Sequence, residues 1–278
     1  NLKQQVHSLQ QQLFSTVEKV NAISDEQLTN AFRLLGASIK SLSRTINFPN
    51  RINVLDIEAI GGSVLVAPVN KELWLARGRK KSLIEAFIWS VLLQHVFCNP
   101  FAVLGPDCVQ LALWWSSLFG NEGGVAANPL AERWRYTTLE QMMRVKDTIT
   151  QGVVIGSEDP AQLSIMKARQ AVHNSIYHSL FQISPASDFG MIDAIIDKAF
   201  ALALDMAIQR CRVQTFRGQI GEVYNQYVSL HLKSSLENED LPEGCVAFVI
   251  KPGLEKWGDG QGKHLDQKLV LVPSEVFI

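Results

Sequence analysis

The sequence predicts a mainly α-helical protein: an N-terminal coiled-coil helix, followed by a helical bundle domain with a small C-terminal β-hairpin. Three observations lead to this prediction. Apolar residues recur about every 3.5 residues over residues 1–23, they recur with a helical period over most of residues 24–236, and short β-type runs follow in the tail. We therefore divide the 278 residues into a coiled-coil segment (1–23), an amphipathic helix with a linker (24–49), and a helical domain (50–278) whose hairpin lies near 245–273.

The coiled-coil prediction depends on two interleaved sets of residues, each with a spacing of seven. One set is Val6, Leu13 and Val20, and the other is Leu2, Leu9, Thr16 and Ile23. Val at position a with Leu at position d favours a parallel dimer, and only Thr16 interrupts this pattern. The residues expected to oligomerise the chain are Leu2, Val6, Leu9, Leu13, Val20 and Ile23. Because three heptads are marginal alone and the chain starts with Asn1, we expect the coiled coil to continue upstream in a longer polypeptide.

Residues 24–46 predict an amphipathic helix. Ser24, followed three residues later by Gln27, is a capping-box pattern that satisfies free amides at a helix start. The apolar stripe has helical offsets and consists of Leu28, Ala31, Phe32, Leu35, Ile39, Leu42 and Ile46. Pro49 ends this helix, because the residue before a proline is driven out of the helical region. We place the linker at residues 47–50.

The rest of the chain is predicted to be chiefly helical. The expected helices lie near residues 82–98, 106–119, 129–150, 159–181, 187–216 and 220–236. The helix at 187–216 is apolar on nearly every face, which is typical of a helix at the centre of a bundle. Residues 245–250 and 268–272 are β-type runs separated by a glycine-rich loop at 258–262, so we expect a small hairpin packed on the bundle.

Charge is scarce and unevenly distributed along the chain. Charged residues make up 19% of the sequence, against about 25% in an average soluble domain, and 26 basic and 27 acidic residues give a net charge of −1. This balance argues against a disordered chain and against a strongly basic nucleic-acid binder. No Lys or Arg occurs between residues 82 and 132. We interpret that stretch as a buried helical hairpin, since no run reaches the roughly 18 uninterrupted apolar residues of a membrane-spanning helix.

A basic cluster stands directly before the charge-poor stretch and consists of Arg77, Arg79, Lys80 and Lys81. We interpret it as a solvated turn. Contact of these side chains with phosphates or with an anionic membrane surface is the alternative that we favour less. The cluster is not a phosphate-binding loop, because Gly78 is followed by Arg79 and lacks the earlier glycine of that motif.

The sequence contains no recognisable catalytic, cofactor or metal motif, and we expect none of these activities. His95 and Cys98 lack the further ligands that zinc requires. Asp193 and Asp197 lie early in a predicted helix, where the helix dipole alone accounts for acidic residues. Neither a serine-nucleophile elbow nor a local cysteine signature occurs. The four scattered cysteines are typical of reduced thiols, so we expect an intracellular protein, either cytoplasmic or nuclear.

Three segments resemble poorly characterised proteins of filamentous fungi that couple a coiled coil to a helical C-terminal region. These segments are the Gln-rich heptads, the helix from Ser24 to Arg44, and the tail from Pro252 to Asp266. The resemblance implies the same layout for this chain. It implies no activity and no catalytic residues.

The leading functional hypothesis is a non-enzymatic oligomeric scaffold or regulatory protein–protein interaction module. It would pair with itself as a parallel homodimer through the coiled coil and present a surface of the helical domain to another protein. The alternative is a helical domain that binds an apolar ligand or an anionic membrane surface through Trp89, Trp114, Trp115 and the basic cluster. An enzyme whose active site is assembled from distant residues ranks third. The burial or exposure of residues 82–132 is the observation that decides between these hypotheses.

Overall fold

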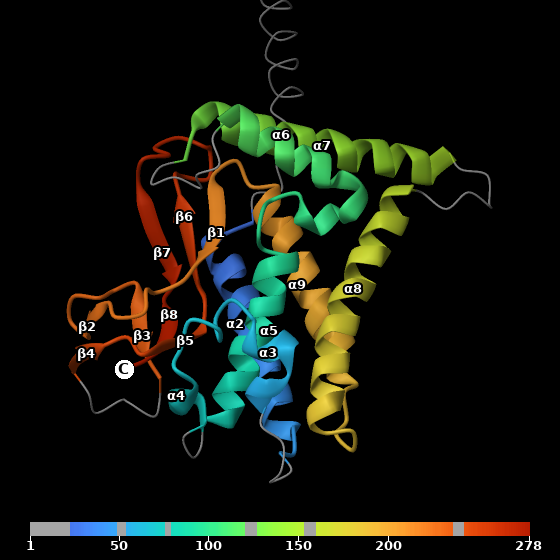
Figure 1. The fold of residues 1–278 in the computed structure, drawn as a ribbon. Coiled ribbons are helices and arrows are strands. Elements are labelled where there is room, and N and C mark those ends of the chain that lie inside the picture. Colours follow the sequence, from blue (N-terminus) through green and yellow to red (C-terminus); the bar gives the residue numbers. More distant parts are fainter. Residues whose placement is uncertain (1–22, 49–53, 76–78, 120–126, 153–159, 236–241) are drawn as a thin grey trace, which may run out of the picture.

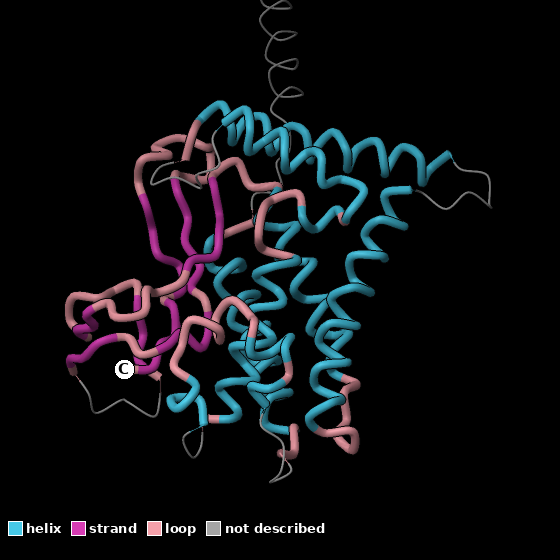
Figure 2. The backbone as a smooth tube through the Cα atoms, viewed as in Figure 1, coloured by secondary structure: helices cyan, strands magenta, loops and turns pink. Residues whose placement is uncertain are grey.

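The structure is a computed structural model that describes residues 23–48, 54–75, 79–119, 127–152, 160–235 and 242–278. Within these residues, eight α-helices are followed by eight short strands in three sheets. Figure 2 shows the strands gathered on one side of the helices. The protein is therefore α+β, and its C-terminal part is larger than the small hairpin that the sequence predicted.

The helices predicted between residues 24 and 207 are confirmed, whereas the predicted coiled-coil helix lies almost wholly outside the described residues. Ser24 accepts a hydrogen bond from the Gln27 amide (3.2 Å), and Gln27 Oε1 accepts one from the Ser24 amide (2.9 Å), so the capping box is present. The helices are α2 (Asp25–Thr45), α3 (Glu58–Gly61), α4 (Lys71–Leu75), α5 (Lys80–His95), α6 (Val109–Phe119), α7 (Pro129–Gly152), α8 (Pro160–Ile183) and α9 (Met191–Ala207).

Helix α5 lies at the centre of the helical part. Every residue from 83 to 92 is buried, including Glu85. Helices α2 and α8 and strand β5 (Phe248–Lys251) pack against it, and Phe32 of α2 meets Trp89 with 5.2 Å between the ring centres. Helix α2 precedes the expected linker, yet its buried residues belong to the same hydrophobic core as buried residues that follow the linker.

The two helices of the charge-poor stretch have different surroundings. The predicted burial of the hairpin is confirmed for α5. The prediction is wrong for α6, in which no residue is buried. Figure 1 shows α6 and α7 lying across one end of the molecule, beyond the ends of α5 and α9. Helix α9, predicted to be central, has an exposed face that includes Asp193 and Asp197.

The predicted helix at 187–216 ends at Ala207, and its last part is strand β1 (Arg212–Phe216). The predicted helix at 220–236 is also wrong, because β2 (Val223–Asn225) and β3 (Leu232–Ser234) occupy it. Gly221, with φ of 82°, interrupts any helix there, and its amide donates to the Val246 carbonyl. Pairing with distant strands thus overrides the local helical pattern.

The strands form three sheets. In the first, β1, β6 (Gly253–Trp257) and β7 (Lys268–Val272) are antiparallel, with β6 in the middle. In the second, β8 (Ser274–Phe277) lies between β5, which is antiparallel to it, and β3, which is parallel to it. The third pairs β2 with β4 (Glu243–Cys245).

The predicted hairpin joined the wrong strands. Strand β7 pairs with β6, whereas the earlier β-type run forms β5 and pairs with β8. The glycine-rich loop does connect two paired strands, β6 and β7, as expected. Gly258 and Gly262 have φ values of 91° and 74°, a left-handed conformation that favours glycine.

Helix α5 carries a buried carboxylate, Glu85. Ser43 Oγ of α2 donates a hydrogen bond to Glu85 Oε1 (3.2 Å), and burial raises the pKa of Glu85 above its ordinary value. The nearby Lys40 acts in the opposite direction on this pKa, and Glu275 of β8 raises it further. A raised pKa means that the folded protein holds the Glu85 proton more tightly than the unfolded chain does.

The stability contributed by this proton is present below the unfolded pKa of about 4.5 and is lost as the pH rises through the folded pKa. We therefore expect Glu85→Gln to gain melting temperature relative to the wild type as the pH rises from about 4.5. Thermal unfolding followed by circular dichroism over a pH series measures this difference. Glu72→Gln, at an exposed carboxylate of α4, is the control and should show no such trend. A difference that is independent of pH contradicts the prediction.

Candidate functional site

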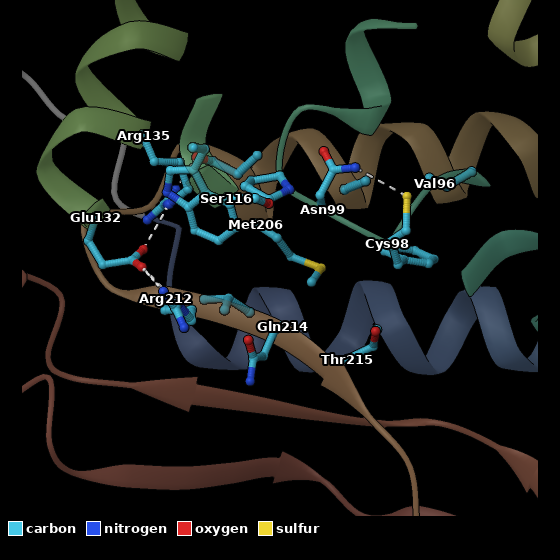
Figure 3. A pocket seen from close by; sticks show the side chains of 16 residues that line it. Val96, Cys98, Asn99, Ser116, Glu132, Arg135, Met206, Arg212, Gln214 and Thr215 are labelled. Atoms are coloured by element: carbon cyan, nitrogen blue, oxygen red, sulfur yellow. Dashed lines mark hydrogen bonds and ion pairs between the residues drawn. The ribbon is translucent and has the colours of Figure 1, made fainter. Parts of the chain in front are cut away.

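The candidate site is a pocket of about 270 Å³ where α6, α7, the end of α9 and strand β1 meet the segment after α5 (Figure 3). It combines apolar walls with charged and polar side chains. The residues that line it are Val96, Phe97, Cys98, Asn99, Pro100, Trp115, Ser116, Glu132, Arg135, Ala203, Met206, Ala207, Arg212, Val213, Gln214 and Thr215.

Three buried charged side chains form one wall, and we call Glu132, Arg135 and Arg212 the ionic triad. Their exposed fractions are 1%, 3% and 7%. Arg135 Nε lies 2.8 Å from Glu132 Oε2, and Arg212 Nε lies 2.7 Å from Glu132 Oε1. The triad therefore joins helix α7 to strand β1, as the dashed lines in Figure 3 show.

Local sequence places the two triad residues of α7. Asn128 caps this helix, because its Oδ1 accepts from the amides of Leu130 (2.9 Å) and Ala131 (3.4 Å), and Pro129 occupies the first turn. Glu132 and Arg135 are three residues apart, so they share one face of α7.

Arg135 also terminates helix α9. Its guanidinium donates to the carbonyls of Ala207, Gln209 (2.6 Å) and Cys211 (2.9 Å). The last carbonyls of a helix have no partner within the helix, and here a side chain from α7 satisfies the polar groups at the end of α9. The helix therefore ends before Arg212, where strand β1 begins.

Arg212 is the triad residue whose guanidinium faces an aromatic ring. Its Cζ lies 5.5 Å from the centre of the Trp115 ring, and the Trp115 indole donates to the Ala131 carbonyl (3.3 Å). A guanidinium over an aromatic ring is an attractive arrangement that holds both groups in place. Two guanidiniums and one carboxylate leave the triad with a net charge of +1, which suits the pocket to a negatively charged group.

The remaining polar groups of the pocket do not form a reactive centre. Cys98 is exposed on one side, but its partial burial in the pocket wall raises the pKa of the thiol, which keeps it protonated near neutral pH, and Asn99 Nδ2 donates to Cys98 Sγ (3.3 Å). On the same segment, burial lowers the pKa of His95. Among the described residues, no group of three or more His, Cys, Asp or Glu side chains is arranged to hold a metal ion.

The three described residues of the basic cluster contact different parts of the protein. Arg79 donates to the Leu73 carbonyl (2.9 Å) and stacks 4.1 Å from the centre of the Phe277 ring. Lys80 lies 5.7 Å from the centre of the Phe48 ring. Lys81 donates to the Arg44 carbonyl (3.5 Å), and Arg77 lies outside the described residues. Each of the three described side chains has a different contact within the protein.

Most of the predicted coiled-coil seam lies outside the described part of the chain, namely Leu2, Val6, Leu9, Leu13 and Val20. Ile23, expected at the end of the seam, is half-buried and packs against the protein's own core. The three tryptophans singled out by the sequence have different positions: Trp89 is buried, Trp115 is half-buried in the pocket wall, and Trp114 is exposed.

The sequence did not predict that one face of α6 would be exposed and apolar. Four large apolar side chains on it have exposed fractions between 52% and 66%, and the polar residues beside them, Gln110 and Ser117, carry no charge. We call these four residues the α6 face; they are Val109, Leu113, Trp114 and Leu118. The opposite side of α6 packs on the core through Leu111, Ala112 and Trp115.

Comparison of the chain with known protein families, with curated proteins and with solved structures gives no match. Among the described residues, no helix has the length and apolar character needed to cross a membrane. The pocket, the ionic triad and the α6 face are therefore the features of this protein that bear on its function.

We expect Glu132→Gln to destabilise the fold by about 3–5 kcal/mol, because it leaves two buried guanidiniums without their shared carboxylate. Urea unfolding followed by circular dichroism measures the loss. The matched control is Asp107→Asn, which breaks an exposed pair with Lys167 (3.2 Å) and should cost about 1 kcal/mol or less. Equal losses in the two variants would show that the triad is not a structural link.

Proposed function

We propose that this chain is a non-enzymatic interaction module that forms a parallel homodimer through residues 1–23 and brings the α6 faces of two copies together. The exposed, uncharged α6 face is the observation that carries this proposal. Large exposed apolar areas mark interaction sites, and the α6 face exposes four large apolar side chains with the uncharged Gln110 and Ser117 between them.

Composition supports an interface on α6. The helix has no charged residue, and its neighbours in the charge-poor stretch include no Lys or Arg up to Glu132. Interface cores are depleted of charged residues and enriched in aromatic ones, and Trp114 is the most prominent aromatic residue on the α6 face. Leu130, at the start of the adjacent α7, is exposed as well and extends the apolar surface.

The path of the chain supports a second copy as the occupant. Asp25, at the start of α2, pairs with Lys256 of β6 (2.7 Å). The next residue, Trp257, packs with Ala127, which immediately precedes α7, and α7 packs on α6. Helix α2 therefore begins on the side of the domain where α7 and α6 pack. A parallel coiled coil places the two α2 helices side by side and brings this side of each copy near the other.

A further protein would find a separate surface. Several apolar side chains are exposed around β2 and the turn before β3: Val223, Tyr227, Val228 and Leu230. This cluster lies away from α6, on the far side of the strands (Figure 1). It stays accessible when the α6 face is covered, which fits a scaffold that binds itself and another protein.

The alternative function, binding to an anionic membrane surface, has less support. The basic cluster lies at the first residues of α5, whereas α6 lies beyond the last residues of α5. A helix of 16 residues is about 24 Å long, so the two features are separated by roughly that distance. One flat surface cannot readily contact both. Flotation with anionic vesicles, with Arg79, Lys80 and Lys81 neutralised as the comparison, tests this alternative.

We expect Leu9→Lys with Leu13→Lys to halve the mass measured by light scattering and to leave the circular-dichroism signal of the domain unchanged, since two charges enter the apolar seam. The control is Gln4→Lys with Gln11→Lys, at positions predicted to face solvent in the same heptads. An unchanged mass in the Leu9 and Leu13 variant rules out the coiled-coil dimer.

A second variant tests the α6 face separately. Leu113→Lys with Leu118→Lys is expected to raise the dimer dissociation constant by roughly tenfold or more, because charges are then buried between the copies. Val228→Lys with Leu230→Lys is the control, since these two apolar side chains are also exposed, at 75% and 79%, and lie away from α6. Sedimentation equilibrium measures the constants. If both variants dimerise like the wild type, a partner other than a second copy covers the α6 face.

A further inference from the structure

We propose that the pocket beside the ionic triad binds a small organic anion, with its carboxylate on Arg212 and its apolar part against Trp115 and Met206. Binding in this pocket does not require formation of the dimer. The triad contains two guanidiniums and one carboxylate, and each of these three side chains is at least nine-tenths buried. A buried charge without a counter-charge is costly, and a bound anion supplies that counter-charge.

Arg212, and not Arg135, is the group that meets the ligand. Arg135 uses its guanidinium on Glu132 and on three backbone carbonyls. The contacts of Arg212 with Glu132 involve only Nε and Nη2. Within the described residues, Arg212 Nη1 has no hydrogen-bond partner, and Arg212 lines the pocket. An arginine with donors to spare is well suited to a carboxylate, which accepts two parallel hydrogen bonds.

The rest of the pocket suits a ligand with a polar and an apolar end. Trp115, Met206 and Ala203 offer apolar contact, and Thr215 of β1 adds a hydroxyl to the lining, whereas the Gln214 amide already donates to Glu255 (2.7 Å). Ligand pockets commonly combine apolar walls with a few polar groups that fix orientation. At about 30 Å³ for each water molecule, the volume of about 270 Å³ corresponds to roughly nine waters. This is the size of benzoate or a branched aliphatic acid.

The net positive charge of the ionic triad excludes cationic ligands. A metal cation or an amine would have to replace Arg212 beside Glu132, and both oxygens of Glu132 already accept from arginines. Inorganic phosphate would leave the apolar wall unused. A carboxylate with an apolar body uses both halves of the pocket.

The test is a thermal-shift and calorimetric titration of the full chain with benzoate, phenylacetate and isovalerate, each compared with its uncharged amide. We expect at least one carboxylate to raise the melting temperature, by an amount that grows with the logarithm of its concentration above the dissociation constant, and its amide to bind roughly tenfold more weakly or worse. Arg212→Met should lose this binding. Because that variant also disturbs the triad, a second pair of variants leaves the charges intact.

Ser116→Phe fills the pocket from α6 without changing the triad, and Ser117→Phe adds the same ring at the next, exposed position as the matched control. We expect the first variant to abolish carboxylate binding and the second to retain it. Binding that persists in Ser116→Phe places the ligand elsewhere and overturns the proposal. A failure of all three carboxylates to bind the wild type overturns it as well.

Cysteine alkylation gives an independent measurement on the unmodified sequence. Cys98 lines the pocket and is exposed, and Cys245 is an exposed cysteine on β4, away from the pocket. A bound carboxylate should slow the reaction of iodoacetamide with Cys98 relative to Cys245, by a factor that follows its occupancy. An unchanged ratio of the two rates at saturating carboxylate contradicts binding in this pocket.

Discussion

A helix with no polar face has to be covered on every side, and α5 imposes that requirement on the rest of the protein. Its residues from 83 to 92 are buried without interruption. Helices α2 and α8 cover part of its surface, and strand β5 covers another part. The small sheets are therefore not an appendage to a helical bundle, since they complete the core around α5. Even the one carboxylate in this stretch, Glu85, is taken into the interior, where Ser43 of α2 provides a hydrogen bond.

The ionic triad links this helical core to the sheets. Arg135 satisfies the carbonyls at the end of α9, and Glu132 holds Arg212 at the start of β1. Arg135 of α7 thereby ends helix α9, and Glu132, one turn away on α7, positions strand β1. The same arrangement leaves a positive charge at the wall of a pocket. The structural role and the proposed ligand site thus share residues, which is why the pocket variants at Ser116 and Ser117 separate the two roles better than a change in the triad does.

The two helices of the charge-poor stretch use their apolar residues in different ways. Helix α5 uses its apolar residues for the core, whereas α6 uses one side for packing and leaves Trp114 and Leu118 on the outside. Asp25, at the start of α2, pairs with Lys256, and the next residue, Trp257, packs with Ala127 just before α7. In the proposed dimer, the apolar composition of α6 is explained by a second copy, in the same way that the composition of α5 is explained by the core.

The sequence by itself determined the features that depend on neighbours within about four residues. Ser24 and Gln27 cap α2, Pro129 begins α7, and Gly258 and Gly262 turn the chain between β6 and β7. Only the tertiary structure decided the features that join distant segments. Residues 212–216, predicted from the sequence to be the end of a helix, form a strand, because β6 offers them a ladder of hydrogen bonds and Arg135 ends the preceding helix. Glu132 and Arg212 are 80 residues apart, so no spacing in the sequence could pair them. Likewise, α5 and α6 have similar composition, and which of them is buried depends on the elements that pack around each.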